Sequence, residues 1–142
     1  MYRYSLRLVR EAAPDPIGRQ VLTPADAAAF LKPMLYDEAV EVAVVLMLDR
    51  RHRLRGYHEV GRGGVAHAAM ESREVLSSAL HAGAAAFMVA HNHPSGEATA
   101  SADDIAVTRR LMRGAELVGL EFVDHIIVAG DEWSSLVESR VV

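Results

Sequence analysis

Three residues near the middle of the chain have the types and the spacing of a metal site. His91 and His93 stand two positions apart at the end of the apolar run 84–90. If the strand that this run predicts continues through them, their imidazoles point to the same side of a sheet. Asp104 would be the third residue of a helix capped by Ser101, where its carboxylate can point back at the histidines. Two histidines and one aspartate leave a fourth position open for water, which is the layout of a catalytic zinc site.

A purely structural interpretation of the same residues stands beside this one. Ser101-x-x-Asp104 fits a capping box, in which the carboxylate only completes the N-terminus of a helix, and the two roles are compatible. A lone histidine usually packs or faces solvent. A His-x-His pair that ends an apolar strand and precedes Pro94 and a helix start is far more typical of a metal site. We therefore predict that His91, His93 and Asp104 are metal ligands.

The flanking sequence predicts the elements that must hold these residues. Pro94 ends strand pairing because it has no N–H, and a helix from Ser101 to about Gly119 follows. The other elements expected, in chain order, are an edge strand over Tyr2–Leu8, a loop over 10–22, a helix from Thr23 that Pro33 kinks or ends early, a hairpin of strands 41–49 and 53–60, a helix over 72–82 and a hairpin of strands 120–128 and 133–137. This order predicts one α/β domain over residues 1–142, in which a mixed β-sheet is flanked by helices. An N-terminal strand and loop would occupy residues 1–22, and the core would occupy residues 23–142.

The central motif resembles that of the JAMM (MPN-domain) metallopeptidases, in which His-x-His, seven residues and Ser-x-x-Asp follow one another. Seven residues, 94–100, separate His93 from Ser101 here. More closely, the chain resembles the RadC-like branch of that superfamily over residues 20–138. The matching motifs are His-Asn-His-Pro-Ser-Gly at 91–96, Ser72-Arg73-Glu74-Val75, Thr108-Arg109-Arg110-Leu111 and Asp124-His125-Ile126-Ile127. The resemblance implies a cytidine-deaminase-like sandwich fold.

The resemblance also implies a zinc-dependent hydrolase that cleaves a peptide or isopeptide bond. Zinc would lower the pKa of a bound water to about 7, and a carboxylate would take the water's proton and give it to the leaving amine. In the family this glutamate lies on the first central strand. Glu41 is therefore our first choice, and Glu59, at the end of the next strand, is the fallback. Ser101 resembles the motif serine whose hydroxyl stabilises the oxyanion, although N-capping alone would also explain it.

The Asp124-His125 pair has two interpretations. On a strand the two side chains face opposite sides, so His125 either supports the metal ligands from behind or is satisfied at a sheet edge, which is the interpretation we favour. Two other functional classes stay open for the whole chain. One is a metal-dependent DNA-processing or DNA-repair accessory protein, as the RadC name suggests, and the other is a metal-binding scaffold without catalysis.

The composition narrows these choices. The 142 residues contain no cysteine, so metal ligands must be His, Asp or Glu, a zinc deaminase site is excluded, and we expect a cytoplasmic protein. The formal charge of −4 argues against general nucleic-acid binding. No apolar run is long enough to span a membrane. Apolar residues make up 51% of the chain, which leaves room for a homodimer surface.

Overall fold

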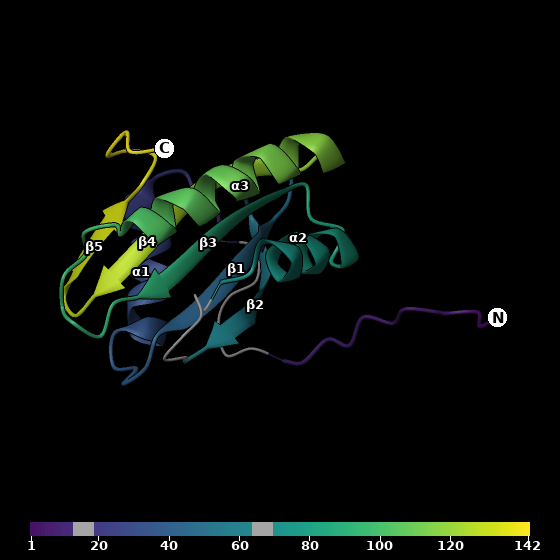
Figure 1. Cartoon of the computed structure of the whole chain (residues 1–142), viewed down its shortest axis with the longest axis horizontal. Coiled ribbons are helices and arrows are strands. Elements are labelled where there is room, and N and C mark those ends of the chain that lie inside the picture. Colours follow the sequence, from purple (N-terminus) through teal and green to yellow (C-terminus); the bar gives the residue numbers. More distant parts are fainter. Residues whose placement is uncertain (13–18, 64–69) are drawn as a thin grey trace.

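Five strands form one mixed sheet that is covered by helices on both faces (Figure 1). The computed structural model describes residues 1–12, 19–63 and 70–142. The elements are α1 (Pro24–Leu35), β1 (Val42–Leu48), β2 (Leu54–Arg62), α2 (Ser72–His81), β3 (Ala86–Asn92), α3 (Ala102–Val118), β4 (Glu121–Ala129) and β5 (Glu132–Ser135). The predicted α/β class with a mixed sheet is confirmed. Of the helices in these described ranges, none is both long and apolar enough to cross a membrane.

The strand order β2-β1-β3-β4-β5 puts β3, which carries the histidines, in the middle of the sheet. β1 is antiparallel to both β2 and β3, β4 runs parallel to β3, and β5 closes an antiparallel hairpin with β4. Every residue of β1 and of β3 is buried, which is why both strands read as continuous apolar runs. The carboxyl end of β3 therefore emerges between two neighbouring strands that can bring further side chains to it.

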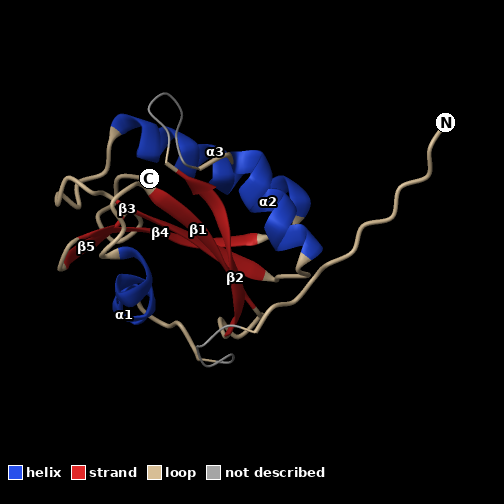
Figure 2. Ribbon diagram, turned by 90° about the horizontal axis from the view of Figure 1, so that it is seen from below, coloured by secondary structure: helices blue, strands red, loops and turns tan. Residues whose placement is uncertain are grey.

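α1 packs on one face of the sheet, and α2 and α3 pack on the other (Figure 2). Alternate residues of β3 divide between the two layers: Met88 and Ala90 belong to the core on the α1 side, and Val89 belongs to the core on the α2-α3 side. His91 continues the row of Val89. Its ring therefore projects beneath α3, the helix that carries Asp104 in its first turn.

Both long helices begin at the residues that the sequence indicated. Thr23 and Asp26 form a capping box at the start of α1, and Ser101 and Asp104 form one at the start of α3. Pro33 does not end α1, which continues for two more residues. A proline in the last turn removes only one intrahelical hydrogen bond, so the helix tolerates it there.

The prediction of a strand over Tyr2–Leu8 is wrong. Residues 1–12 contain neither helix nor strand and run away from the domain as an extended segment (Figure 1). An alternating sequence is stable as a strand only where a neighbouring strand supplies hydrogen bonds and an apolar face. Within the described parts of the chain, no strand lies beside this segment. The predicted loop over 10–22 falls partly on residues 13–18, which lie outside the described residues.

Gly114 lies where α3 contacts Leu76 of α2. A methyl group added at its Cα would lie 2.6 Å from Cδ1 of Leu76, which is far inside van der Waals contact.

We expect Gly114→Val to lower the free energy of unfolding by about 1–3 kcal/mol, because the added methyl groups overpack the contact between the two helices. Leu76→Ala in the same chain should remove part of this loss, so the two changes should be less than additive. Chemical denaturation of both single variants and the double variant measures the effect. A Gly114→Val protein as stable as the wild type would contradict close packing at this point.

Candidate metal centre

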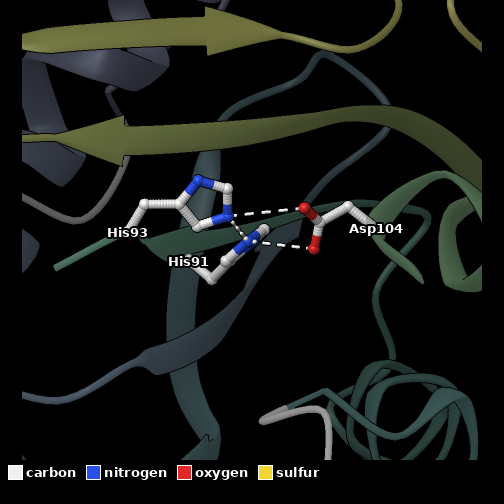
Figure 3. Close-up of side chains that lie close together, drawn as sticks. All are labelled: His91, His93 and Asp104. Atoms are coloured by element: carbon white, nitrogen blue, oxygen red, sulfur yellow. Dashed lines mark hydrogen bonds and ion pairs between the residues drawn. The ribbon is translucent and has the colours of Figure 1, made fainter. Parts of the chain in front are cut away.

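His91, His93 and Asp104 come together where β3 ends beneath the first turn of α3 (Figure 3). One potential ligand atom from each residue lies within 4.8 Å of the others. His91 Nε2 is 3.1 Å from Asp104 Oδ1, and His93 Nε2 is 3.4 Å from Asp104 Oδ2. The two Nε2 atoms are 2.9 Å apart. These three residues, which the sequence singled out, form one cluster that could bind a metal ion.

The cluster is shielded from solvent on the side of His91 and more open at its other members. The side chain of His91 is 2% exposed, whereas those of His93 and Asp104 are 15% and 13% exposed. Burial raises the pKa of Asp104, but the hydrogen bond and charge of His91 and the hydrogen bonds of Ser101 outweigh it, so the pKa of this carboxyl lies well below its usual range. Asp104 is therefore anionic at neutral pH, as a ligand carboxylate must be.

A buried chain of hydrogen bonds fixes His91 from behind. Thr108 Oγ1 lies 2.6 Å from the backbone oxygen of Asp104 and 2.6 Å from Nδ1 of His125. Because a carbonyl only accepts, Thr108 donates its single proton to Asp104 and accepts from the Nδ1–H of His125. Burial, together with the charge of His91, lowers the pKa of His125 to about 3, so its Nε2 is an acceptor. That atom lies 2.8 Å from Nδ1 of His91, which must therefore donate.

In their neutral forms, both imidazoles present Nε2 lone pairs to the cluster. A neutral His91 with its proton on Nδ1 has its lone pair on Nε2. His93 Nδ1 lies 2.8 Å from the backbone oxygen of Glu97, which can only accept, so neutral His93 is also protonated on Nδ1. Two lone pairs this close repel each other unless a cation lies between them.

The donor set therefore fits a divalent metal. Two neutral imidazole nitrogens and one carboxylate suit zinc, and they also suit several other first-row metals. The carbonyl behind His93 and the imidazole behind His91 each accept the second ring N–H, which is how metal-binding histidines are commonly oriented.

Ser101 caps α3 and orients the carboxylate at the same time. Its hydroxyl accepts from the N–H of Asp104 at 3.1 Å and donates to Asp104 Oδ2 at 2.7 Å, and its own N–H donates to Oδ2 at 2.7 Å. The capping and metal-site interpretations of this pair are thus compatible in space. The carboxylate that closes the helix N-terminus is the one that faces His91 and His93.

Asn92 lies between the two histidines in the sequence, and its side chain projects to the opposite face of the sheet. It is 3% exposed. Its Oδ1 accepts from the N–H of Val42 at 2.6 Å, and its Nδ2 donates to the backbone oxygens of Val40 at 2.9 Å and Glu38 at 3.3 Å. One side-chain amide thus holds the segment that leads into β1 against the end of β3.

Glu41, our first choice for the general base, lies on this held segment and outside the three-residue cluster. Ala43 pairs with His91 across β1 and β3, so the two share a face of the sheet. Glu41 is two residues earlier and immediately precedes β1, and alternation continued from Ala43 would put its side chain on that same face. Its backbone oxygen accepts from the N–H of Gly63 at 2.7 Å, so the segment is held from both sides.

Glu59, the fallback for the general base, belongs to the other face of the sheet. It pairs with Val44, whose side chain lies in the core on the α1 side. Its two carboxylate oxygens accept from Arg62 at 2.8 and 2.9 Å, and this hydrogen bonding lowers the pKa of Glu59. A carboxylate held by an arginine on the face away from the histidines is poorly placed to move a proton at the cluster.

Thr108 is a supporting residue that the sequence interpretation missed, and His125 is one that it considered but did not favour. We favoured a sheet edge for His125, which is wrong: β4 lies between β3 and β5, and His125 bonds to His91 inside the sheet. The parallel pairing of β3 with β4 brings the two rings together, and no local pattern encodes that pairing. Thr108 carried a weak signal, because it stands four residues after Asp104 and so shares its face of α3.

The fold and the site define a domain of the JAB (MPN) type, in which a His-x-His strand end faces a Ser-x-x-Asp helix start. The family model for the RadC-like JAB domain matches residues 21–141. A UPF0758 protein of Marinobacter nauticus is 40% identical over 136 residues, which cover 94% of this chain and 61% of that protein. UPF0758 proteins of Thioalkalivibrio sulfidiphilus and Acidithiobacillus ferrooxidans are 42% and 43% identical over 85% and 82% of this chain.

The chain therefore belongs to the RadC-like JAB domain family. It covers 61%, 54% and 52% of the length of these three relatives. The family assignment accordingly concerns this domain.

We expect Thr108→Val to lower the free energy of unfolding by about 1–3 kcal/mol, because it leaves the buried Nδ1–H of His125 without an acceptor. Urea denaturation of protein treated with a chelator measures this loss without any contribution from metal binding. Thr99→Val is the matched control: Thr99 is exposed, so the same chemical change should alter stability by less than about 0.5 kcal/mol. Equal effects of the two changes would contradict the hydrogen-bond chain.

Proposed function

We propose that the chain is a zinc-dependent hydrolase that cleaves an amide bond of the peptide or isopeptide type. The observation that carries this proposal is the cluster of His91, His93 and Asp104, whose two Nε2 atoms and carboxylate converge within 4.8 Å. Three protein ligands leave one zinc position for water, and the partial exposure of His93 supports access from solvent. The cysteine-free sequence suits a reducing compartment such as the cytoplasm.

The proposed ligands would bind the metal, and a different side chain would transfer the proton. When bound, zinc would supply the Lewis acidity that makes a water molecule ionise near neutral pH. Glu41 would accept the proton of that water at its carboxylate and give it to the leaving amine. Two features support this role for Glu41. It lies two residues before Ala43, which pairs with His91, so strand alternation would put its side chain on the face of the histidines. The amide of Asn92 also holds the segment that contains Glu41 at the end of β3. Asn92 would thus be a positioning residue.

Ser101 is the proposed donor to the oxyanion of the tetrahedral intermediate. Its hydroxyl has one proton, which is donated to Asp104 Oδ2. Rotation about the C–O bond can turn that proton toward a substrate oxygen while Oγ still accepts from the N–H of Asp104. Capping and oxyanion stabilisation therefore do not compete for the same lone pair. A donor of this kind is typically worth about 3–4 kcal/mol in the transition state.

Glu41→Gln should lower the turnover of zinc-loaded protein by at least about 100-fold, because an amide cannot accept the proton of the attacking water. Cleavage of a library of quenched-fluorescent peptides and isopeptides measures turnover, and mass spectrometry of the same samples measures bound zinc. Zinc content should be unchanged, because Glu41 lies outside the ligand cluster.

Glu59→Gln is the matched control, and it should leave turnover unchanged because Glu59 is bound to Arg62 on the other face of the sheet. Loss of turnover in the Glu59 variant alone would reverse the assignment of the base. Wild-type protein that holds zinc and cleaves no member of the library would instead favour a metal-binding scaffold without catalysis.

A further inference from the structure

A cavity of about 360 Å³ lies beside the candidate metal centre, between the loop that joins β3 to α3 and the edge strand β5. Ala98, Thr99 and Ala100 line it from the loop, and Glu132 and Ser134 line it from β5. The hydroxyl of Ser134 donates to the backbone oxygen of Ala98, where the loop passes beside β5 (Figure 1). This hydrogen bond ties the two walls of the cavity to each other.

The sheet register places this cavity on the same face of the sheet as the histidines. His91 pairs with Ile127 of β4, and Ile127 pairs with Ser134 of β5. Side chains at paired positions project to the same face, so Ser134 lies in the row of His91, two strands away. Two strand spacings amount to about 10 Å. Glu132 stands two residues before Ser134 and therefore projects to this face as well.

The wall of the cavity also continues directly into the site along the chain. Ala100 precedes Ser101, the proposed oxyanion donor, and Ile105 follows Asp104. An extended peptide advances about 3.3 Å per residue. A substrate whose scissile carbonyl is bound at the metal centre can therefore reach the cavity with a long side chain that lies one or two residues from that carbonyl.

Two serine hydroxyls and one carboxylate on the cavity wall act as hydrogen-bond acceptors. Ser134 donates its hydroxyl proton to the backbone oxygen of Ala98, and Ser139 donates its own to the backbone oxygen of Ser135. While these bonds last, both hydroxyl oxygens can only accept from a ligand. Glu132 adds a carboxylate, which also accepts. This set favours a ligand that donates hydrogen bonds.

Glu132 gives the wall a negative charge. Of the described residues that line the cavity, it alone is charged, and no ion pair within the described ranges includes it. The neighbouring cation is Arg109 of α3, whose guanidinium donates to the backbone oxygen of the wall residue Val141 at 3.2 Å. Glu132 belongs to β5, so a cation supplied by a ligand would bind on the β5 side of the cavity.

We propose that this cavity is the subsite for a lysine or arginine side chain next to the scissile bond, and that Glu132 determines this specificity; the proposal rests on the proposed function. The aliphatic stem would lie along the apolar wall of Ala98, Ile105 and Leu136. Its cationic end would reach Glu132 at the exposed rim. Because exposed ion pairs stabilise only weakly, the selectivity that we expect is a few-fold preference.

Binding of short peptides to the chelator-treated chain tests the subsite without any cleavage. The probes are acetyl-Ala-Lys-Ala-amide and the same peptide with norleucine in place of lysine, which keeps an aliphatic stem and removes the charge. In NMR titrations of isotope-labelled protein, the lysine peptide should shift the backbone amide signals of Ala98, Ala100 and Ser134, which line the cavity. It should also bind about threefold more tightly than the norleucine peptide.

Variants of Glu132 test the source of this preference. Glu132→Gln should make the two peptides bind equally, because the amide keeps the shape of the side chain and removes its charge. Glu132→Lys should favour a third peptide that has glutamate at the central position. Glu116→Lys is the matched control, because it makes the same charge change at an exposed position about three turns beyond Ile105 on α3, about 16 Å along the helix axis. It should leave the preference for lysine unchanged.

Three results of these titrations would each overturn the proposal. They are equal binding of the lysine and norleucine peptides by the wild type, shifts confined to residues outside the cavity, and no shift up to the solubility limit of the peptides.

Cleavage of the peptide library separates this proposal from the proposed function. Zinc-loaded wild type should prefer lysine or arginine at one position within two residues of the cleaved bond, and Glu132→Lys should lose that preference. Peptides that bind in the cavity as expected and are not cleaved would support the cation-binding cavity and contradict the hydrolase. Cleavage without any preference for a cationic side chain would support the hydrolase and overturn the subsite.

Discussion

The hydrogen bond from Thr108 to the backbone oxygen of Asp104 is the interaction on which the arrangement of the site depends. A carbonyl cannot donate, so this bond fixes where every proton lies along the chain from Thr108 through His125 to His91. The chain of bonds connects α3, β4 and β3. The direction of the lone pair on His91 is therefore a consequence of helix geometry at one end and of parallel strand pairing at the other.

Side chains at the end of β3 project to both faces of the sheet. Strand alternation sends the rings of His91 and His93 toward α3 and the amide of Asn92 toward the α1 side. The imidazoles build the candidate metal centre, and the amide holds the segment that bears Glu41. Three consecutive residues thus couple the proposed metal ligands to the proposed base through one strand. A change at Asn92 is expected to disturb the base without touching the ligands.

The parts of the structure that could be predicted from the sequence are those with local causes. A capping box, an apolar run and a proline are readable over a few residues, so the helix start at Ser101 and the strand that ends at the histidines followed directly. The position of His125 required the pairing of β3 with β4, and the failure of Tyr2–Leu8 to form a strand required knowledge that no partner strand lies beside it. Both depend on contacts between distant segments, which periodicity does not encode.

Metal content per chain is the sharpest test of whether His91, His93 and Asp104 bind a metal ion. Mass spectrometry of wild type and His93→Ala, purified side by side without a histidine tag, supplies the measurement. We expect about one zinc per wild-type chain and its loss from the variant, which keeps only two of the three ligands. Wild-type protein that holds no metal even after zinc is added back would contradict the account, and the domain would then be a binding module that uses the fold without the chemistry.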